Sequence, residues 1–350
     1  MNVLLISPHM QKPNGGIAAW TNLYLNGCQN TGISPKVLNI ATAGRRAKNG
    51  SAKISFLDEI YRTKRILKDL NSFLKKTDFN VAHINTSCGR FGIIRDYLTV
   101  KIIKKKQPDA KIITHFHCDI PVQIRTKTGK KYLGKLLALS NENLVLCEAS
   151  RVYLKNEFCA NGVKIPNFLD EQIVLDDFKT IRNNVEKILF VGRVSEAKGA
   201  REIYELARHF PNITFELVGA VSENVSKWDT PTNIILSGSI DHNEIFNKMD
   251  EADAFLFPSH SEGFSIALAE AMARGLPAVA TDVGANYDMI ENKGGVVVSV
   301  GDIDAMRSAI NQLIDPDVRS RMSQWNIEKV RSKYLTTNVM RELLNKYEGI

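Results

Sequence analysis

The sequence predicts an α/β protein built from two Rossmann-like domains that face each other across a cleft. Short apolar segments alternate with helical segments in both halves of the chain, and this alternation is typical of parallel sheets covered by helices on both faces. A length of 350 residues is large for one core and sufficient for two. Ligands of such sheets bind beyond the carboxyl ends of the strands, so we expect the functional residues in the loops that follow them.

The N-terminal domain is expected to span residues 1–167. Its predicted strands are short apolar runs at 2–7, 35–40, 81–85, 111–115, 143–147 and 163–166. The helices between them are predicted from apolar residues spaced three or four apart, at 16–26, 56–75 and 91–106. A stretch at 43–51 that is rich in glycine and basic residues predicts a loop.

The C-terminal domain is expected to span residues 168–335 and to repeat the same scheme. Its predicted strands lie at 188–191, 213–218, 234–236, 254–257, 278–281 and 296–299, with helices between them. The boundary between the domains is placed near the Pro-Asn-Phe sequence at 166–168. A last helix is predicted at 338–347 within the terminal segment 336–350.

Two carboxylates eight positions apart, Glu262 and Glu270, follow the apolar strand at 254–257. Ser265 is a residue type favoured as a helix N-cap, and Gly275 is a residue type that ends helices. Glu262 should therefore lie in the loop between strand and helix, whereas Glu270 should project from the second turn of the helix.

The start of this helix is predicted to bind an anion. Its first residues, Phe264, Ser265 and Ile266, leave backbone N–H groups without helical partners, and the helix dipole is positive at this end. Carboxylates on either side of an anion site suit a ligand that carries both hydroxyl and phosphate groups. A nucleotide-sugar has both.

Cations and glycines follow strands in both halves. Arg193 and Lys198 come after the strand at 188–191, where two cations could neutralise a diphosphate leaving group. Gly15 and Gly16 open the helix after the first strand, and glycines there let the backbone approach a phosphate or sugar closely. They do not form a Gly-x-Gly-x-x-Gly dinucleotide-binding motif.

A histidine follows the strand at 111–115. His117 should lie at the carboxyl edge of the sheet, where it could hydrogen-bond a sugar hydroxyl or a developing charge. His115, at the end of the strand itself, is expected to be structural.

In this order, the elements resemble those of the retaining GT-B glycosyltransferases of glycosyltransferase family 4. The resemblance covers nearly the full length. It is carried by the Gly15-Gly16 loop, the Thr-His-Phe-His stretch at 114–117, the Ile-Pro-Asn sequence at 165–167, the Gly-Arg-x4-Lys-Gly loop at 192–199 and the Glu-x7-Glu motif at 262–270.

The resemblance implies roles for these residues. Arg193 and Lys198 would bind the donor pyrophosphate in place of a metal ion, and Glu270 would accept hydrogen bonds from the ribose. Glu262 and His117 would act on the donor sugar. It further implies that the N-terminal domain binds the acceptor, that the C-terminal domain binds the nucleotide-sugar, and that the last helix crosses back to the N-terminal domain.

Two routes to retention of configuration are open. A double displacement needs a carboxylate within bonding reach of the anomeric carbon. A same-face substitution instead uses the leaving phosphate to help deprotonate the acceptor, and this is the route usually assigned to the family. The sequence does not decide between them.

No metal site and no cofactor is expected. The Asp-x-Asp sequence at Asp302 and Asp304 follows Gly301 at the start of a predicted helix. Both acids are explained as an N-cap and a first-turn residue.

Charge is divided unevenly between the halves. Residues 1–168 hold 27 Lys and Arg against 10 Asp and Glu, a net charge of +17, whereas the remainder carries −9. This asymmetry indicates an anionic partner for the first half, either an anionic inner-membrane surface or an acidic acceptor. Nucleic acid is not expected, because no reading helix or aromatic stacking platform is apparent. The candidate contact residues are Arg45, Arg46, Lys104, Lys105, Lys106, Lys130 and Lys131.

The cysteines and the N-terminus predict a cytoplasmic protein. Five cysteines without a Cys-x2-Cys pair indicate neither a disulfide framework nor a zinc site. The first residues lack the features of a secretory leader, and no apolar stretch approaches the roughly 20 residues of a membrane span. We expect a cytoplasmic enzyme that can bind the inner face of the cytoplasmic membrane.

The predicted function is therefore metal-independent, retaining transfer of a hexose-type sugar from a nucleoside diphosphate donor, UDP in particular. The expected acceptor is a saccharide or a lipid-linked saccharide in cell-surface glycan biosynthesis, such as capsule or lipopolysaccharide. Two alternatives remain open: a GT-B protein with another activity, such as an epimerase, and a binding module without turnover.

Overall fold

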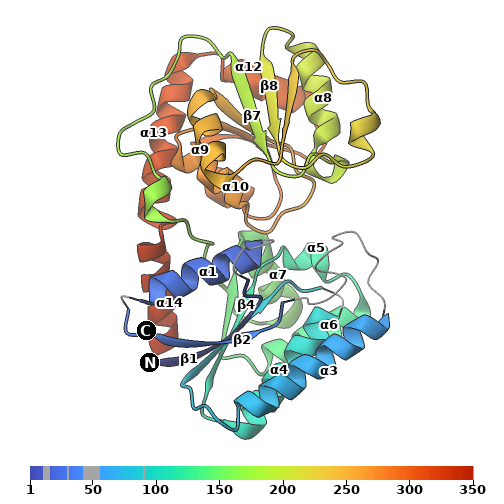
Figure 1. Ribbon diagram of the computed structural model, residues 1–350, viewed down its shortest axis with the longest axis vertical. Coiled ribbons are helices and arrows are strands. Elements are labelled where there is room, and N and C mark those ends of the chain that lie inside the picture. Colours follow the sequence, from blue (N-terminus) through green and yellow to red (C-terminus); the bar gives the residue numbers. More distant parts are fainter. Residues whose placement is uncertain (11–15, 30, 42–55, 90, 350) are drawn as a thin grey trace. The chain divides into compact units, whose positions relative to one another are not determined.

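The structure is a computed structural model that describes residues 1–10, 16–29, 31–41, 56–89 and 91–349. The chain forms two compact units (Figure 1). Unit 1 contains Met1–Phe168 together with Val339–Ile350, and unit 2 contains Leu169–Asn338. The predicted loop at 43–51, which includes Arg45 and Arg46, lies outside the described residues, as does Gly15.

Unit 1 is built on a six-stranded parallel sheet in the order β2-β1-β3-β4-β5-β6. From β1 the chain first adds β2 on one side and then returns to add β3 on the other side. The switch point, where ligands of such sheets bind, therefore lies between β1 and β3. The strands are β1 (Asn2–Ser7), β2 (Ser34–Asn39), β3 (Val81–Thr86), β4 (Lys111–Phe116), β5 (Glu142–Val145) and β6 (Val163–Lys164).

The two faces of this sheet are covered by different helices (Figure 1). Apolar side chains of α3, α4, α6 and α7 form one core, and those of α1 and the C-terminal helix α14 form the other. The helices are α1 (Gly16–Cys28), α3 (Phe56–Phe73), α4 (Gly92–Lys106), α5 (Ile120–Gln123), α6 (Lys127–Leu137), α7 (Glu148–Phe158) and α14 (Thr336–Glu348).

Helix α14 completes the second core of unit 1, although it comes last in the sequence. Its Val339, Met340, Leu343 and Tyr347 are buried. Tyr347 donates through its hydroxyl to the hydroxyl of Tyr24 on α1 at 3.0 Å. Without α14, the face of the sheet beside α1 would lose this apolar cover.

Unit 2 is built on a second six-stranded parallel sheet, in the order β12-β11-β10-β7-β8-β9. This is the doubly wound order, and its switch point lies between β7 and β10. The strands are β7 (Lys187–Val191), β8 (Thr214–Val218), β9 (Ile234–Gly238), β10 (Ala254–Phe257), β11 (Ala278–Thr281) and β12 (Gly295–Val298).

The helices of unit 2 pack in two groups. Helix α8 lies against α12, and α10 lies against α13. Right-handed crossovers on either side of β7 place these groups on opposite faces of the sheet. The helices are α8 (Ala200–His209), α9 (His242–Glu251), α10 (Ile266–Ala273), α11 (Asn286–Ile290), α12 (Ile303–Gln312) and α13 (Pro316–Lys333), with 3-10 turns at Glu171–Ile173, Glu196–Lys198 and Val225–Lys227.

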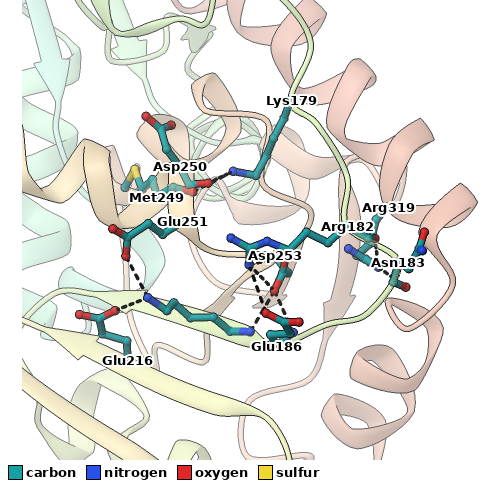
Figure 2. Close-up of polar contacts among 11 residues, drawn as sticks. Lys179, Arg182, Asn183, Glu186, Glu216, Met249, Asp250, Glu251, Asp253 and Arg319 are labelled. Carbon is teal, nitrogen blue, oxygen red and sulfur yellow. Dashed lines mark hydrogen bonds and ion pairs between the residues drawn. The ribbon is translucent and has the colours of Figure 1, made fainter.

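A polar network fixes the amino ends of the central strands β7 and β10 (Figure 2). Asp253, 4% exposed, precedes β10. Its Oδ2 accepts from the backbone N–H groups of Glu186 and Lys187 at 2.8 and 2.9 Å. Its Oδ1 pairs with Nη1 of Arg182 at 3.2 Å. A buried carboxylate satisfied in this way sets the register of the two strands whose far ends carry the candidate site.

A second buried acid, Glu216 on β8, lies in the same network (Figure 2). Lys187 and Lys248 pair with its two oxygens at 3.2 and 3.0 Å, and Ser237 donates to it at 2.7 Å. Burial raises the pKa of this carboxyl, but the three hydrogen bonds outweigh burial and the pKa is lowered. Glu216 therefore stays ionised inside the unit.

The structure confirms the predicted fold class of two parallel α/β sheets. The strands predicted at 2–7, 254–257 and 278–281 have the predicted bounds, and the bounds of the others differ by one or two residues. Helices α6 and α7 were not predicted individually, because the lysines of α6 and the polar residues of α7 weaken the apolar pattern.

Candidate functional site

The candidate site of unit 2 lies at the carboxyl edge of its sheet, at the switch point. The loop 192–199 follows β7 and the loop 258–265 follows the neighbouring strand β10. The chain leaves these two strands toward opposite sides, and ligands of such sheets bind beyond the carboxyl ends of the strands at this point.

Lys198 and Glu262 come from these two loops and form an ion pair. Lys198 Nζ lies 2.5 Å from Glu262 Oε1. The side chain of Glu262 is 12% exposed and that of Lys198 is 32% exposed. The structure thus brings together two residues that are 64 positions apart in the sequence.

Ser259 stabilises this ion pair through a hydrogen bond to Glu262. Its Oγ donates to Glu262 Oε1 at 2.6 Å, and its backbone carbonyl accepts from Thr281 Oγ1 at 2.5 Å. Asn286 Nδ2 in turn donates to the carbonyl of Thr281 at 2.9 Å. The side chains of Ser259, Thr281 and Asn286 are all buried. This chain of buried hydrogen bonds holds the carboxylate of Glu262 in place. The sequence pattern gave no indication of this role of Ser259.

Two glycines allow the loops to approach one another. Gly199 has φ +81°, and a Cβ there would lie 2.2 Å from the carbonyl oxygen of Pro258. Gly284 has φ +55°, and a Cβ there would lie 2.5 Å from the carbonyl oxygen of Gly263. A side chain at either position would push the site loops apart.

A histidine connects the same two loops. The backbone N–H of His260 donates to the carbonyl of Ala197 at 3.1 Å. Its Nε2 lies 2.6 Å from Oε1 of the buried Glu202 in the first turn of α8. Nothing in the sequence pattern indicated this contact, because the two residues are 58 positions apart.

Helix α10 starts and ends as predicted. Ser265 is the N-cap, and its Oγ accepts from the N–H of Leu268 at 3.2 Å. Gly275 follows the helix with φ +68°. Phe264 is buried and Ile266 is half-buried. Roles for their backbone groups in ligand binding stay predictions.

Glu270 lies in the second turn of α10 and is 5% exposed. Its Oε1 is 2.8 Å from Nε2 of His242, the first residue of α9. This partner was not anticipated from the sequence. The only indication of it in the sequence is a histidine at the first position of the helix that connects β9 to β10.

Arg193 lies in the loop after β7 and is exposed. Among the described residues, no carboxylate lies within ion-pair distance of it. Its guanidinium is therefore available for an anion, unlike that of Arg182, which is engaged by Asp253.

His117 belongs to a polar network in unit 1. Its Nε2 donates to Asn85 Oδ1 at 3.0 Å, and Asn85 Nδ2 donates to Ser7 Oγ at 2.9 Å. Burial, with a smaller contribution from His83, lowers the pKa of His117 to about 3. The imidazole is therefore neutral near pH 7, with Nε2 carrying the proton.

The neighbouring histidine has a structural environment. His115 is fully buried, its Nδ1 lies 3.3 Å from Nε2 of His83, and its ring packs edge-on against Trp20. His83 is in turn bonded to Tyr347 of α14 at 2.6 Å. The expectation that His115 is structural agrees with this packing.

A cavity of about 320 Å³ lies beside this network, at the switch point of the unit 1 sheet. Asn85, the partner of His117, lines it together with Arg62 and Arg95. Arg95 is buried and pairs with Asp96 at 2.9 Å. Gly16, the first residue of α1, is exposed and has open space beside it.

The predicted basic residues of unit 1 are not equivalent. Lys105, Lys106 and Lys131 are exposed. Lys104 instead donates to the carbonyl of Ala110 at 3.1 Å and to Asn141 Oδ1 at 3.3 Å. Lys130 pairs with Glu157 at 2.6 Å. The last two have structural partners and are weaker candidates for a surface contact.

The acids of the Asp-x-Asp sequence are placed as predicted. Asp302 is the N-cap of α12, and its Oδ1 accepts from the N–H of Ala305 at 2.9 Å. Asp304 pairs with Arg307 on the same helix at 2.8 Å. Within the described ranges, no three His, Cys, Asp or Glu side chains are grouped as metal ligands.

Comparison with known proteins identifies the class. A family model of the glycosyl transferases group 1 matches residues 174–329, most of unit 2. The capsular polysaccharide biosynthesis glycosyltransferase CapM of Staphylococcus aureus is 26% identical over 341 residues, 88% of this chain and 88% of that protein. The UDP-Gal:alpha-D-GlcNAc-diphosphoundecaprenol alpha-1,3-galactosyltransferase of Escherichia coli is 23% identical over 310 residues, 78% of each chain.

The solved structures agree on the fold. Sucrose-phosphate synthase from Thermosynechococcus elongatus superimposes with a TM-score of 0.80 at 15% identity, over 99% of this chain and 98% of that one. The protein is therefore a glycosyltransferase with the GT-B fold. Its residues 174–329 match the family model of the glycosyl transferases group 1.

None of the helices in the described ranges combines the length and apolar composition that a membrane span needs.

Proposed function

We propose that the protein is a retaining glycosyltransferase that moves a hexose-type sugar from a UDP-sugar to a saccharide or lipid-linked saccharide. The observation that carries the proposal is the Lys198–Glu262 ion pair, held at 2.5 Å at the switch point of unit 2. The names of two relatives support this donor and acceptor. One is a capsular enzyme, and the other uses UDP-Gal and an acceptor linked to diphosphoundecaprenol. The pathway would be synthesis of a capsule, a lipopolysaccharide or a related glycan.

In this proposal, the donor binds to unit 2. Arg193 and Lys198 neutralise the diphosphate, together with the N–H groups at the start of α10, so no metal ion and no cofactor is required. Glu270 accepts from the ribose hydroxyls. Glu262, fixed by Lys198 and Ser259, hydrogen-bonds the transferred sugar.

Unit 1 would bind the acceptor. The cavity beside Asn85 is of a size that fits a sugar unit. The neutral His117, whose Nε2–H donates to Asn85 in this structure, would turn that N–H to a hydroxyl of the donor sugar. Gly15 and Gly16 would let the backbone approach the donor. These roles follow from the resemblance and from the chemistry of each side chain.

For the reaction, we favour the same-face substitution. The bond between the anomeric carbon and the phosphate oxygen breaks, and a bond to the acceptor oxygen forms on the same face. The acceptor proton passes to the departing phosphate oxygen. The cations hold the charge that develops on the diphosphate.

Donor hydrolysis tests the proposal and separates it from its alternatives. Incubation with UDP-glucose, UDP-galactose and UDP-N-acetylglucosamine is expected to release UDP slowly from at least one donor, with the same rate in EDTA. Glu262→Gln is the inactive control. Binding without release would indicate a binding module, and an epimerised nucleotide-sugar would indicate the other alternative.

Loss of activity in EDTA that manganese or magnesium restores would overturn metal independence and reopen the question of Asp302 and Asp304.

We further propose that the basic surface of unit 1 attaches the enzyme to anionic lipid at the inner membrane face. Basic groups near such a surface contribute about 1 kcal/mol each. Binding to vesicles that contain phosphatidylglycerol is expected in low salt and should weaken in high salt, because charges are screened over about 8 Å at physiological ionic strength.

The membrane proposal can be tested by replacing the exposed lysines Lys105, Lys106 and Lys131. Their combined replacement by Gln should lower vesicle binding about tenfold or more, given three contacts of this strength, and leave activity on a short soluble acceptor intact. The matched control replaces three lysines of unit 2, Lys227, Lys293 and Lys333, by Gln. If low-salt co-sedimentation is absent, or if both triple variants lose it equally, the membrane proposal is wrong and an acidic soluble acceptor is favoured.

A further inference from the structure

His242 lies where the two halves of the unit 2 sheet are connected. Helix α9 carries the chain from β9, at one edge of the sheet, back past β7 to β10. His242 is the first residue of this helix, and it reaches Glu270 in the second turn of α10. The contact therefore joins elements from both sides of the switch point.

The two oxygens of Glu270 have different environments. Oε1 lies 2.8 Å from Nε2 of His242. Oε2 accepts no hydrogen bond from any described residue, and it is not among the buried polar atoms without a partner. One oxygen is thus oriented by the protein, while the other can accept from a ligand hydroxyl.

The pair consists of a buried acid and an exposed base. Glu270 is 7% exposed by its side chain, whereas that of His242 is 63% exposed. A buried carboxylate is costly unless it is paired. The hydrogen bond to Glu270 raises the pKa of His242, and partial burial opposes this effect. Protonation of His242, as the pH falls through this raised pKa, therefore turns the hydrogen bond into an ion pair.

Other charged groups near His242 are engaged or belong to its own helix. Phe246 packs edge-on against the imidazole at 4.8 Å. Arg274, the C-cap residue of α10, lies over Phe246 at 6.0 Å and is paired with Asp250. Asp241 is the N-cap position of α9, and its side chain makes no capping hydrogen bond. Glu270 is the charged group that contacts the imidazole.

We propose that His242 is a positioning residue of the donor site: it orients the carboxylate of Glu270 toward the ribose and cancels its negative charge beside the anionic diphosphate. This inference rests on the proposed function, which places the nucleotide at Glu270. A free carboxylate would repel the diphosphate, whereas the imidazolium–carboxylate pair is neutral overall and still accepts a hydrogen bond.

The sign of the pH dependence follows from this arrangement. His242 has a raised pKa in the folded protein, so its charge is present at low pH and is lost as the pH rises through that pKa. A nucleotide-sugar carries two phosphate charges that do not titrate between pH 6 and 8.5. Its affinity should therefore increase as the pH falls across this range, by about two- to fivefold for one partly exposed pair.

The experiment measures the Kd of UDP-glucose by calorimetry from pH 6 to pH 8.5. Wild type should show the two- to fivefold change. His242→Gln keeps a hydrogen-bond donor but no charge, so it should bind at all pH values with the affinity that wild type has at high pH. His242→Ala should bind more weakly throughout. His209→Gln, an exposed histidine in the last turn of α8, is the matched control and should keep the wild-type profile.

A second measurement does not depend on the variants. The ring proton of His242, followed by NMR, should titrate at a higher pH with UDP-glucose than without it. An equal pH dependence in wild type and His242→Gln, or an NMR titration unmoved by a ligand that binds, would overturn the inference. If wild type binds neither UDP-glucose nor the other UDP-sugars at any pH, the proposed donor specificity itself fails, and that outcome is separate.

Discussion

Lys198→Ala should lower kcat about 100-fold or more, equivalent to about 2.7 kcal/mol of lost transition-state stabilisation. The ammonium lies 2.5 Å from Glu262, so the substitution removes a cation from the proposed diphosphate position and releases the carboxylate that it holds. Arg193→Ala should have a similar effect, because its guanidinium has no carboxylate partner among the described residues.

The measurement is steady-state turnover of the donor that the hydrolysis assay identifies. Lys227→Ala is the control, since Lys227 is an exposed lysine of unit 2 paired with Glu223, four positions earlier in the chain. Lys198→Arg should retain more activity than Lys198→Ala, because it keeps the charge. Turnover near wild type in both Ala variants would refute the diphosphate clamp, provided that thermal unfolding shows an intact fold.

Asp253→Ala should lower the free energy of unfolding of unit 2 by about 3 kcal/mol. The carboxylate accepts from two backbone N–H groups and pairs with Arg182, and all of these partners would be left unsatisfied at the amino ends of the central strands. The midpoint of thermal unfolding should fall by roughly 6–12 °C for a unit of this size.

A matched control lies on the same edge of the sheet. Glu186 is exposed and lies 4.0 Å from the same guanidinium, so Glu186→Ala should change stability by less than about 0.5 kcal/mol. Asp253→Asn should fall between the two, because the amide oxygen can still accept from the backbone. Equal melting curves for Asp253→Ala and Glu186→Ala would contradict the assigned role.

Much of the fold could be predicted, because parallel strands that are buried on both faces have continuous apolar sequences. The segments 254–257 and 278–281 are strands within their predicted limits. Helix α10 could be predicted from local chemistry, since the Ser265 cap and Gly275 act within one turn of the helix end. The amphipathic helix α6 was overlooked because four of its eleven residues are lysine and two are glycine, a composition that indicates a basic surface segment.

The sequence alone determined the alternating α/β pattern, the presence of Glu262, Glu270, Arg193 and Lys198 in loops or helix starts after strands, and the basic character of the first half. Each of these depends on residues that are neighbours in the chain, or on composition.

Only the tertiary structure decided which side chains meet. Strand order brings the loop of Lys198 to that of Glu262, and the crossover helix α9 brings His242 to Glu270. The tertiary structure also distinguishes lysines that donate to backbone carbonyls from lysines that are exposed. The physical reason is that such contacts depend on which strands become neighbours in the sheet, and strand order is set by packing of the whole unit rather than by local sequence.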